Sequence, residues 1–149
     1  AGKSTLLKLV CGEDIPHGGV LRLASGLNVS YVPQDASSLE GDLSAFAAAS
    51  GIDETLFKTI LRKLDFSRPQ LEKDMGSYSA GQKKKVLLAR SLCQSAHLYV
   101  WDEPLNYVDV FSRMQLEALL RDYPCTLLLV EHDASFLQAV GARTVELGR

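Results

Sequence analysis

The sequence lacks the cysteine pattern that marks disulfide-rich or zinc-binding proteins. Its 149 residues include only three cysteines, Cys11, Cys93 and Cys125, which lie far apart and show no metal-ligand spacing. An odd, scattered set of this kind is typical of a protein kept in a reducing compartment. We therefore expect a cytoplasmic protein in which all three cysteines act as small buried hydrophobic residues.

Long apolar runs and a strong net charge are also missing. No segment approaches the roughly 20 apolar residues that a membrane-spanning helix requires, and the start of the chain has no signal-peptide character. The formal net charge is only −2, which gives no sign of a nucleic-acid or anionic-membrane surface. With 46% hydrophobic and 23% charged residues and no internal repeat, the composition is typical of one globular domain.

The order of the predicted elements favours an α/β fold with a mostly parallel sheet. The short apolar runs at 97–101 (HLYVW) and 125–130 (CTLLLV) predict strands at the centre of a sheet that is covered on both faces. Between them a helix is predicted after Asp109, its N-cap, from apolar residues at helical spacing: Val110, Met114, Ala118 and Leu119. Further strands are expected at 20–23, 29–32 and 144–147, and a first helix at 3–10.

The middle of the chain is predicted to be helical. Helices are expected over 42–49 and 53–64, the second with an apolar face formed by Leu56, Ile60, Leu61 and Leu64. A turn at 76–78 precedes another helix at 79–93. We interpret residues from about 41 to 93 as a small helical subdomain within a single domain that spans 1–149.

The first residues, Ala1-Gly2-Lys3-Ser4-Thr5, match the second half of the phosphate-binding P-loop pattern G-x-x-x-x-G-K-[ST]. In such a loop Gly2 lets backbone amides approach phosphate oxygens, Lys3 bridges the β- and γ-phosphates, and the Ser4 hydroxyl binds Mg²⁺. A Gly-Lys-Ser-Thr sequence also occurs by chance at the start of a helix, so other motifs must decide.

A pair of carboxylates, Asp102 and Glu103, follows the apolar run 98–101. Ligands of open α/β sheets collect at the carboxyl ends of the strands, where these side chains are expected. In this Walker B arrangement Asp102 would hold Mg²⁺, and Glu103 would orient and polarise the attacking water. The alternative is an acidic start to the next helix, and the P-loop half favours the catalytic reading.

Residues 78–82, Tyr-Ser-Ala-Gly-Gln, resemble the LSGGQ signature of ABC ATPases, with Tyr in place of Leu and Ala in place of the first Gly. The resemblance implies that Ser79 and the amides near Gly81 bind the γ-phosphate of ATP in an opposite cassette. The ordinary alternative is a serine-capped helix. For the three lysines at 83–85 we expect a solvated, charged helix face.

Three further matches follow in the order of that family. Gln34, in Tyr-Val-Pro-Gln, resembles the Q-loop glutamine that reaches Mg²⁺, and His132, in Val-Glu-His-Asp, resembles the switch histidine that touches the γ-phosphate. Asp109 falls at the D-loop position, which lies at the cassette interface. We interpret the remaining histidines, His17 and His97, as structural or solvent-exposed.

The resemblance covers essentially the whole chain and implies a P-loop NTPase of the ABC type. It implies a site for ATP and Mg²⁺ that includes Gly2, Lys3, Ser4 and Thr5, catalysis by Glu103 and His132, and pairing with a second cassette. Because the sequence starts inside the P-loop pattern and the strand before it is missing, we expect weak or no ATPase activity from these 149 residues alone.

Details of the motifs favour the ABC-F branch. Repair-type ABC ATPases carry a long coiled coil between Q-loop and signature, whereas Gln34 and Ser79 are 79 − 34 = 45 positions apart without sustained heptads. Residues 103–109 (EPLNYVD) resemble the ABC-F pattern E-P-T-N-H-L-D, and 131–137 (EHDASFL) resemble S-H-D-R-x-F-L. The stretches 78–90 and 101–113 are similar to antibiotic-resistance members of the Lsa and Vga type.

This branch implies the second of two cassettes in one chain, which binds the ribosome through regions outside this sequence and leaves it after hydrolysis. Resistance by ribosomal protection would be its role. Two alternatives stay open. One is the ATPase subunit of a transporter, with a membrane permease as partner, and the other is a module that holds nucleotide without turnover.

Overall fold

The structure is a computed structural model of the chain, and it describes residues 7, 10–11, 26–122 and 125–142. The predicted phosphate-binding residues Gly2, Lys3, Ser4 and Thr5 lie outside the described residues, as do His17 and the strands predicted at 20–23 and 144–147. Within the helix predicted at 3–10 only Leu7 and Val10 are described, and both are helical.

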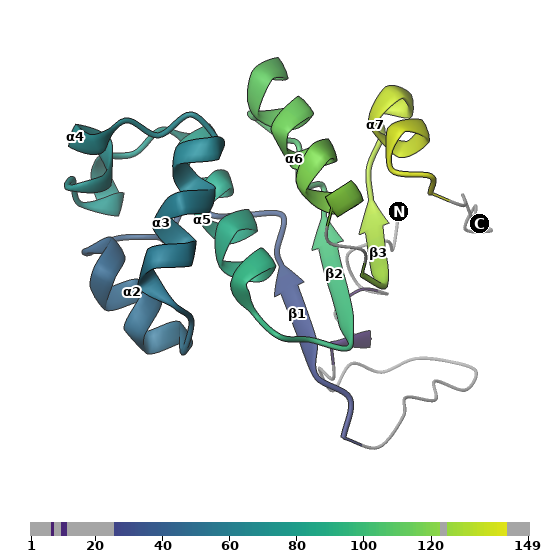
Figure 1. Cartoon of the computed structure of the whole chain (residues 1–149), viewed down its shortest axis with the longest axis horizontal. Helices are drawn as coiled ribbons and strands as arrows, with labels where there is room; N and C mark the ends of the chain where they lie inside the picture. Colours follow the sequence, from purple (N-terminus) through teal and green to yellow (C-terminus); the bar gives the residue numbers. More distant parts are fainter. Residues whose placement is uncertain (1–6, 8–9, 12–25, 123–124, 143–149) are drawn as a thin grey trace.

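Three parallel strands form the described sheet, in the order β1 (Val29–Val32), β2 (Leu98–Asp102), β3 (Leu127–Val130) (Figure 1). The strands predicted at 29–32, 97–101 and 125–130 are therefore confirmed. β2 lies between the other two, and its last three residues are buried, as its continuous apolar run predicts. Since all three strands run the same way, the loops that follow them meet at one edge.

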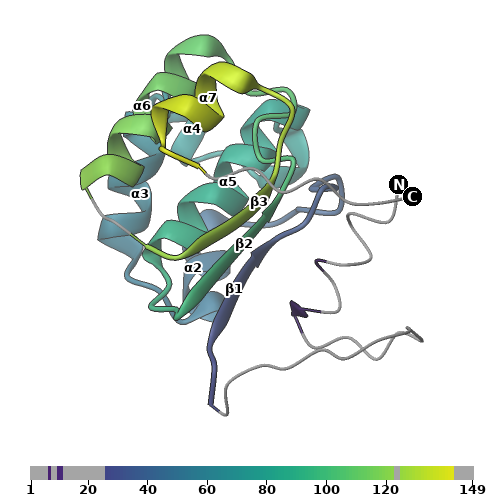
Figure 2. The ribbon, with the colours of Figure 1, turned by 90° about the vertical axis from the view of Figure 1, so that its right-hand side faces the viewer.

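Helices α5 (Ala80–Cys93) and α6 (Val110–Asp122) lie on the same side of the sheet, and α7 (Ala134–Ala139) follows β3 (Figure 2). A buried polar network fixes α5 against the strands. The Ser91 hydroxyl lies 2.6 Å from that of Ser30 in β1 and accepts a 2.8 Å hydrogen bond from the indole nitrogen of Trp101 in β2. Ser30 also donates to Gln94, so these buried polar groups have partners.

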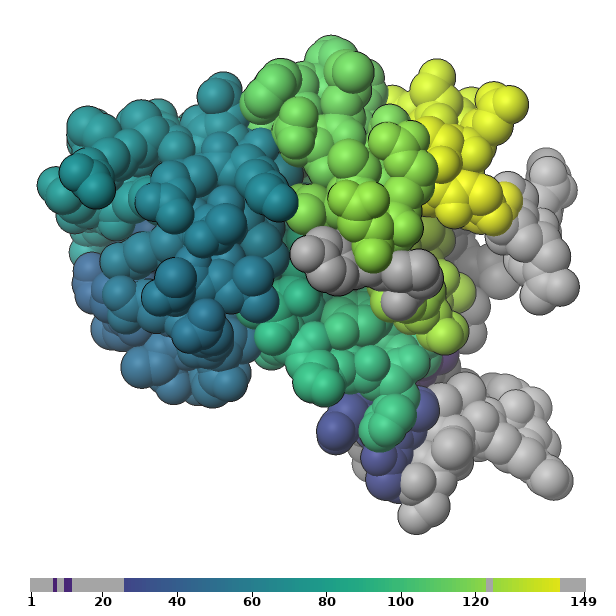
Figure 3. Space-filling view, viewed as in Figure 1, coloured from purple at the N-terminus to yellow at the C-terminus, as the bar shows by residue number. Residues whose placement is uncertain are grey.

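The remaining helices, α2 (Leu43–Ser50), α3 (Glu54–Lys63), α4 (Arg68–Leu71) and the 3-10 turn η1 (Met75–Ser77), gather beside α5 (Figures 1 and 3). Each begins after a side chain that accepts a backbone N–H hydrogen bond, which satisfies free donors of the first turn; these caps are Asp42, Asp53, Ser67 and Asp74. The helices expected at 42–49, 53–64 and 79–93 are confirmed, while the subdomain boundary at 41–93 stays a prediction. No helix in the described ranges has both the length and the apolar character that crossing a membrane requires.

The helix predicted after Asp109 is confirmed as α6, but only part of its predicted apolar spacing faces the core, where Leu119 is buried. Val110 and Met114 are 61% and 58% exposed, whereas Ser112 and Leu116 are fully buried. The Ser112 hydroxyl explains the difference, because it donates a 3.0 Å hydrogen bond to the carbonyl of Leu64. A satisfied serine therefore occupies a core position that sequence patterns reserve for apolar residues.

Two other predictions of burial are corrected. In α3 the buried face contains Phe57, while Leu56 is 46% exposed. Cys125 is exposed, and Cys11 and Cys93 are half-buried, so the cysteines are not a set of core residues. Cys125 lies before the first paired residue of β3, Leu127, outside the covered part of the sheet. His97 fits its structural interpretation, since its Nδ1 accepts a hydrogen bond from the backbone N–H of Asn28.

Candidate functional site

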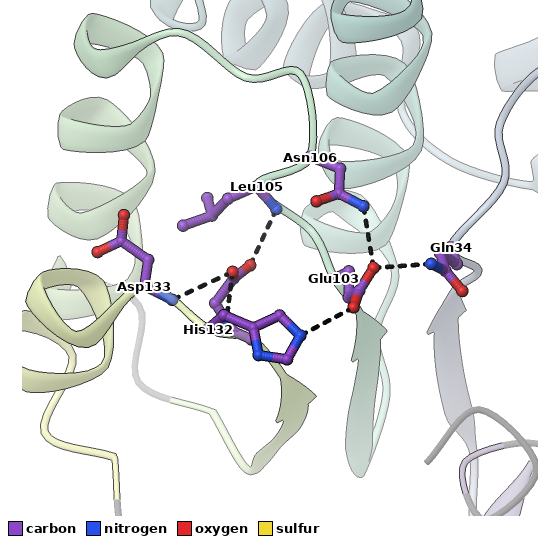
Figure 4. Close-up of polar contacts among 7 residues, drawn as sticks. Gln34, Glu103, Leu105, Asn106, His132 and Asp133 are labelled. Atoms are coloured by element: carbon purple, nitrogen blue, oxygen red, sulfur yellow. Dashed lines mark hydrogen bonds and ion pairs between the residues drawn. The ribbon is translucent and has the colours of Figure 1, made fainter. Parts of the chain in front are cut away.

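Glu103 lies at the carboxyl-end edge of the sheet, directly after β2 ends at Asp102. Its backbone N–H still donates to the carbonyl of Val130 at 2.8 Å, but its φ is +49°. A positive φ is uncommon outside glycine and asparagine, and such strained residues cluster at functional sites. The chain thus leaves the sheet at Glu103, and the carboxylate faces the loops that follow β1 and β3 (Figure 4).

Three side chains from three different loops hold the Glu103 carboxylate (Figure 4). Gln34 Nε2 donates to one oxygen at 2.7 Å and Asn106 Nδ2 donates to the same oxygen at 3.0 Å. His132 Nε2 lies 3.1 Å from the other oxygen. The structure therefore brings together Gln34, Glu103 and His132, which the sequence singled out, and adds Asn106, which had no assigned role.

These contacts decide the charge of Glu103. Partial burial acts to raise the pKa of its carboxyl, but the hydrogen bonds from Asn106, His132 and Gln34 outweigh burial and place it below the ordinary value of 4.5. The side chain is 19% exposed, so solvent reaches it. Glu103 is consequently an ionised acceptor at neutral pH, as the general base of a hydrolase must be.

The loop that carries His132 is fixed by a carboxylate that sequence reasoning missed. Glu131 accepts hydrogen bonds from the backbone N–H groups of Leu105 at 3.2 Å, His132 at 2.8 Å and Asp133 at 3.4 Å. Asp133 in turn caps α7 and pairs with Arg113 of α6. In the sequence, Glu131 is recognisable only as an acidic residue directly before a candidate histidine. Its contact with Leu105 depends on how the two loops pack in the fold.

The predicted Mg²⁺ ligands are partly described. Asp102 is 2% exposed and immediately precedes Glu103, and Gln34 contacts Glu103 through its amide nitrogen, so its amide oxygen can face an ion. Ser4 lies outside the described residues. Among the described residues, no group of three or more His, Cys, Asp and Glu side chains is arranged to hold a metal ion. The predicted ligands are thus one carboxylate, from Asp102, and neutral oxygens. Such a set suits Mg²⁺ that is bound mainly through nucleotide phosphates, rather than a metal ion held by protein ligands alone.

Ser79 is an exposed N-cap with a capping box, a geometry that both interpretations of this motif share, so its contact with an opposite nucleotide stays a prediction. Its hydroxyl accepts from Gln82 N at 3.1 Å, and its own N–H donates to the Gln82 side chain at 2.9 Å. Gly81 has no room for a side chain, because a Cβ there would lie 2.2 Å from the carbonyl oxygen of Tyr107. Tyr107 itself has a φ of +65°. The signature segment and the D-loop segment are thus in direct backbone contact.

Asp109 caps α6 and forms a 2.6 Å ion pair with Lys85. Burial acts to raise the pKa of this carboxyl, but hydrogen bonds from Lys85 and Ser112 outweigh it and lower the pKa strongly. Its side chain is 46% exposed, and its place at a cassette interface stays a prediction.

The solvated lysine face predicted at 83–85 is wrong. Lys84 and Lys85 are only 1% and 7% exposed, and the ammonium of Lys83 donates to the carbonyl of Ser37 at 2.9 Å. Each ammonium donates to an oxygen of another segment. These hydrogen bonds offset the desolvation cost of burying Lys84 and Lys85.

With the fold and the Glu103 cluster described, the family can be assigned. The family model described as "ABC transporter" matches residues 1–106. The chain belongs to the ABC transporter family. Its match extends through the carboxylates that end β2, and the α/β cassette fold expected from the motifs is confirmed.

Curated relatives of this ABC cassette include ATP-binding proteins with and without a transport role in their names. The chain is 34% identical over 150 residues to the putative ATP-binding protein YdiF of Bacillus subtilis, covering 98% of the chain and 23% of YdiF. It is 34% identical over 154 residues to the zinc import ATP-binding protein ZnuC 1 of Aliivibrio fischeri, with 99% and 59% covered. It is 28% identical over 152 residues to ABC transporter F family member 2 of Arabidopsis thaliana, with 98% and 22% covered.

Among solved structures, the cassette is similar to the archaeal ribosome recycling factor aABCE1 in its complex with the ribosomal stalk protein aP1. The TM-score is 0.73 at 27% identity, and the match covers 93% of this chain and 28% of that one. The chain therefore spans about a quarter of the length of this neighbour and of YdiF.

Proposed function

We propose that this ABC cassette binds Mg-ATP and hydrolyses it with Glu103 as the general base. The observation that carries the proposal is the ionised Glu103 carboxylate, which Gln34, Asn106 and His132 hold at the sheet edge. A catalytic base must be both charged and fixed in direction, and this arrangement provides both.

The described residues divide the chemical work. Glu103 orients a water molecule and accepts its proton, while Gln34 and Asn106 fix one carboxylate oxygen and His132 the other. His132 is 68% exposed, so its ring can also donate to a phosphate oxygen. Bound Mg²⁺ supplies charge neutralisation of the phosphates. Asp102 and Gln34 offer oxygen ligands for it, together with Ser4, and Gly2, Lys3 and Thr5 complete the phosphate site.

A second cassette completes the functional unit. Ser79 is exposed at the start of α5, a helix of 14 residues, and the N-terminus of a helix of this length attracts anions. Ser79 and the amides near Gly81 therefore face a γ-phosphate held by the partner cassette, with Asp109 near the interface.

We further propose that the protein is an ABC-F member that acts on the ribosome. The E-P-L-N-Y-V-D and E-H-D segments, the F family relative and the ribosome recycling factor among structural neighbours support this. Two closed, ATP-bound cassettes would keep the protein on the ribosome in the cytoplasm, and hydrolysis would release it. The Lsa- and Vga-like stretches favour resistance by ribosomal protection.

A transporter role is the second candidate, because ZnuC 1, a zinc import ATP-binding protein, is as similar to this chain as YdiF is. The partner would then be a membrane permease. The two candidates share the hydrolytic site and differ in what the site controls.

Steady-state ATP hydrolysis by the protein that carries this sequence tests the shared part. We expect Mg²⁺-dependent turnover that falls by roughly 100-fold or more in Glu103→Gln. Glu72→Gln, which changes an exposed carboxylate in the helical region, serves as the control and should keep full turnover. Equal turnover of the wild type and Glu103→Gln would remove Glu103 from the mechanism.

Fractionation of cells that express the Glu103→Gln variant separates the two branches. With ATP bound and hydrolysis blocked, an ABC-F protein should co-sediment with ribosomes in an ATP-dependent manner. Recovery in the membrane fraction with a permease, and no ribosome association, would instead support the transporter role.

A further inference from the structure

Lys84 is buried on the sheet-facing side of α5 yet carries an ammonium group. It is 1% exposed, and it shares this face with Leu88 and Ser91, which follow at helical spacing and are equally buried. Burying an ammonium costs several kcal/mol unless it is hydrogen-bonded. Because an apolar residue would pack there at lower cost, the contacts of Lys84 need an explanation beyond packing.

Those contacts go to the loop that holds Gln34. The ammonium donates to the carbonyl of Gln34 at 2.6 Å and to the carbonyl of Pro33 at 3.1 Å. β1 ends at Val32, so this part of the loop lies beyond the last residue that the sheet hydrogen bonds fix. Lys84 is therefore what ties the backbone of the loop to a rigid element at this point.

Gln34 is thus held at both ends. Lys84 holds its backbone carbonyl, and its side-chain nitrogen donates to Glu103 Oε2 at 2.7 Å. The side chain is otherwise exposed and depends on its backbone for direction. A small shift of the loop would lengthen the hydrogen bond to Glu103 and release one of the carboxylate oxygens.

The electrostatic setting supports the same link. Burial lowers the pKa of the Lys84 ammonium, while the carboxylates of Asp102, Glu103, Asp35 and Glu131 act in the opposite direction and favour the charged form. The positive charge of Lys84 therefore lies in the field of these four carboxylates, which include Glu103. An apolar side chain in its place would lose both the loop contacts and this charge.

We propose that Lys84 is a positioning residue for ATP hydrolysis, which acts by fixing the Gln34 loop so that Gln34 keeps the Glu103 carboxylate in its reactive orientation. This rests on the proposed hydrolytic function of Glu103. Helix α5 would then have two roles. Ser79 at its N-terminus would contact the partner's nucleotide, and Lys84 would position the Gln34 loop.

The test compares Lys84→Met with Lys83→Met in the protein that carries this sequence. Both substitutions remove an ammonium from the same helix, but Lys83 bonds the carbonyl of Ser37, three positions beyond Gln34. We expect Lys84→Met to lower kcat at least roughly 10-fold while the Kd for Mg-ATP changes less than about twofold. Lys83→Met should keep kcat within about twofold of the wild type.

A double-mutant cycle separates positioning from a merely structural role. If Lys84 acts through Gln34, then Lys84→Met should lower kcat by less than about twofold when Gln34 is already replaced by alanine. A full multiplicative loss in the Gln34→Ala background would overturn the proposal. So would an unchanged kcat in Lys84→Met, or an equal loss in Lys83→Met.

Lys84→Gln covers the case in which the methionine variant does not fold. The glutamine amide can donate to one of the two carbonyls. We therefore expect a folded protein whose kcat lies between that of the wild type and that of Lys84→Met. Full kcat in Lys84→Gln, or failure of both variants to fold, would count Lys84 as structural and reject the proposal. If Glu103→Gln abolishes turnover while Lys84→Met retains it, only this inference fails and the proposed function stands.

Discussion

The side-chain amide of Gln34 donates a 2.7 Å hydrogen bond to Glu103, although the two residues are 69 positions apart. This contact joins the loops after β1 and β2, the two strands that pair from Val29–Leu98 to Val32–Trp101. It makes the loop after β1 part of the surroundings of the Glu103 carboxylate, and several consequences of that arrangement can be measured.

The pH dependence of hydrolysis should report the hydrogen bonds to Glu103. Burial acts to raise its pKa, and the bonds from Asn106, His132 and Gln34 lower it below the ordinary 4.5. A base is active above its pKa, so the wild type should retain activity to lower pH than an unassisted glutamate would. Asn106→Ala removes one donor and should move the acid limb of kcat to higher pH, whereas Asn28→Ala, an exposed change away from Glu103, should not move it. An acid limb that stays in place in Asn106→Ala would contradict this account.

Asp109 should stabilise the fold in a pH-dependent way through its bonds with Lys85 and Ser112. Its pKa in the folded protein lies below the ordinary 3.8, so the contribution is fully present above that value and is lost as the pH falls through the folded pKa. Asp109→Asn should therefore lower the free energy of unfolding at neutral pH, and urea titrations should show the gap to the wild type closing only below about pH 4. A gap that is constant down to pH 3 would argue against the ion pair.

Gly81→Ala should displace the D-loop, since the new Cβ would lie 2.2 Å from the backbone oxygen of Tyr107. We expect a loss of about 1–3 kcal/mol in stability, together with reduced ATP hydrolysis, because the loop from Glu103 to Asp109 must move. Gly51→Ala is the matched control. It strains a left-handed helix cap at φ +67° but meets no atom within 4 Å, so it should lower the melting temperature and spare hydrolysis.

Ser91→Ala should destabilise the protein by leaving the Trp101 indole N–H without its buried acceptor. The expected cost is about 1–3 kcal/mol in the free energy of unfolding, measured by denaturant titration. Trp101 is the single tryptophan of this sequence, so its fluorescence should also report the loss. Ser95→Ala, an exposed change four positions on, should leave both measurements unchanged.

The sequence predicted the three strands and the longer helices of the described chain well, because their signals are local, but it missed the short helices α4 and α7. β2 is a continuous apolar run that ends in two carboxylates, and α5 begins with a serine cap and an Ala-Gly-Gln segment. The grouping of Gln34, Glu103 and His132 followed from motif order alone. Each lies in a loop at the carboxyl end of a parallel strand, where the topology forces the loops together.

The errors fall where a polar side chain finds a partner distant in sequence. Ser112 takes a core position because the carbonyl of Leu64 accepts its hydroxyl hydrogen, and Lys84 is buried because two carbonyls beyond β1 accept its ammonium hydrogens. The same applies to Glu131, which accepts a hydrogen bond from the backbone N–H of Leu105 in another loop. No spacing rule identifies such partners, whose pairing depends on how the elements pack.

A single-turnover measurement tests the role of Glu103 most directly, since it isolates the chemical step from binding and product release. ATP and Mg²⁺ are bound first to the wild type, Glu103→Gln and the control Glu72→Gln, and release of phosphate from the bound ATP is then followed. The account predicts that all three bind ATP alike and that only Glu103→Gln holds it intact, with a rate constant lowered roughly 100-fold or more. Phosphate release from Glu103→Gln at the wild-type rate would contradict it.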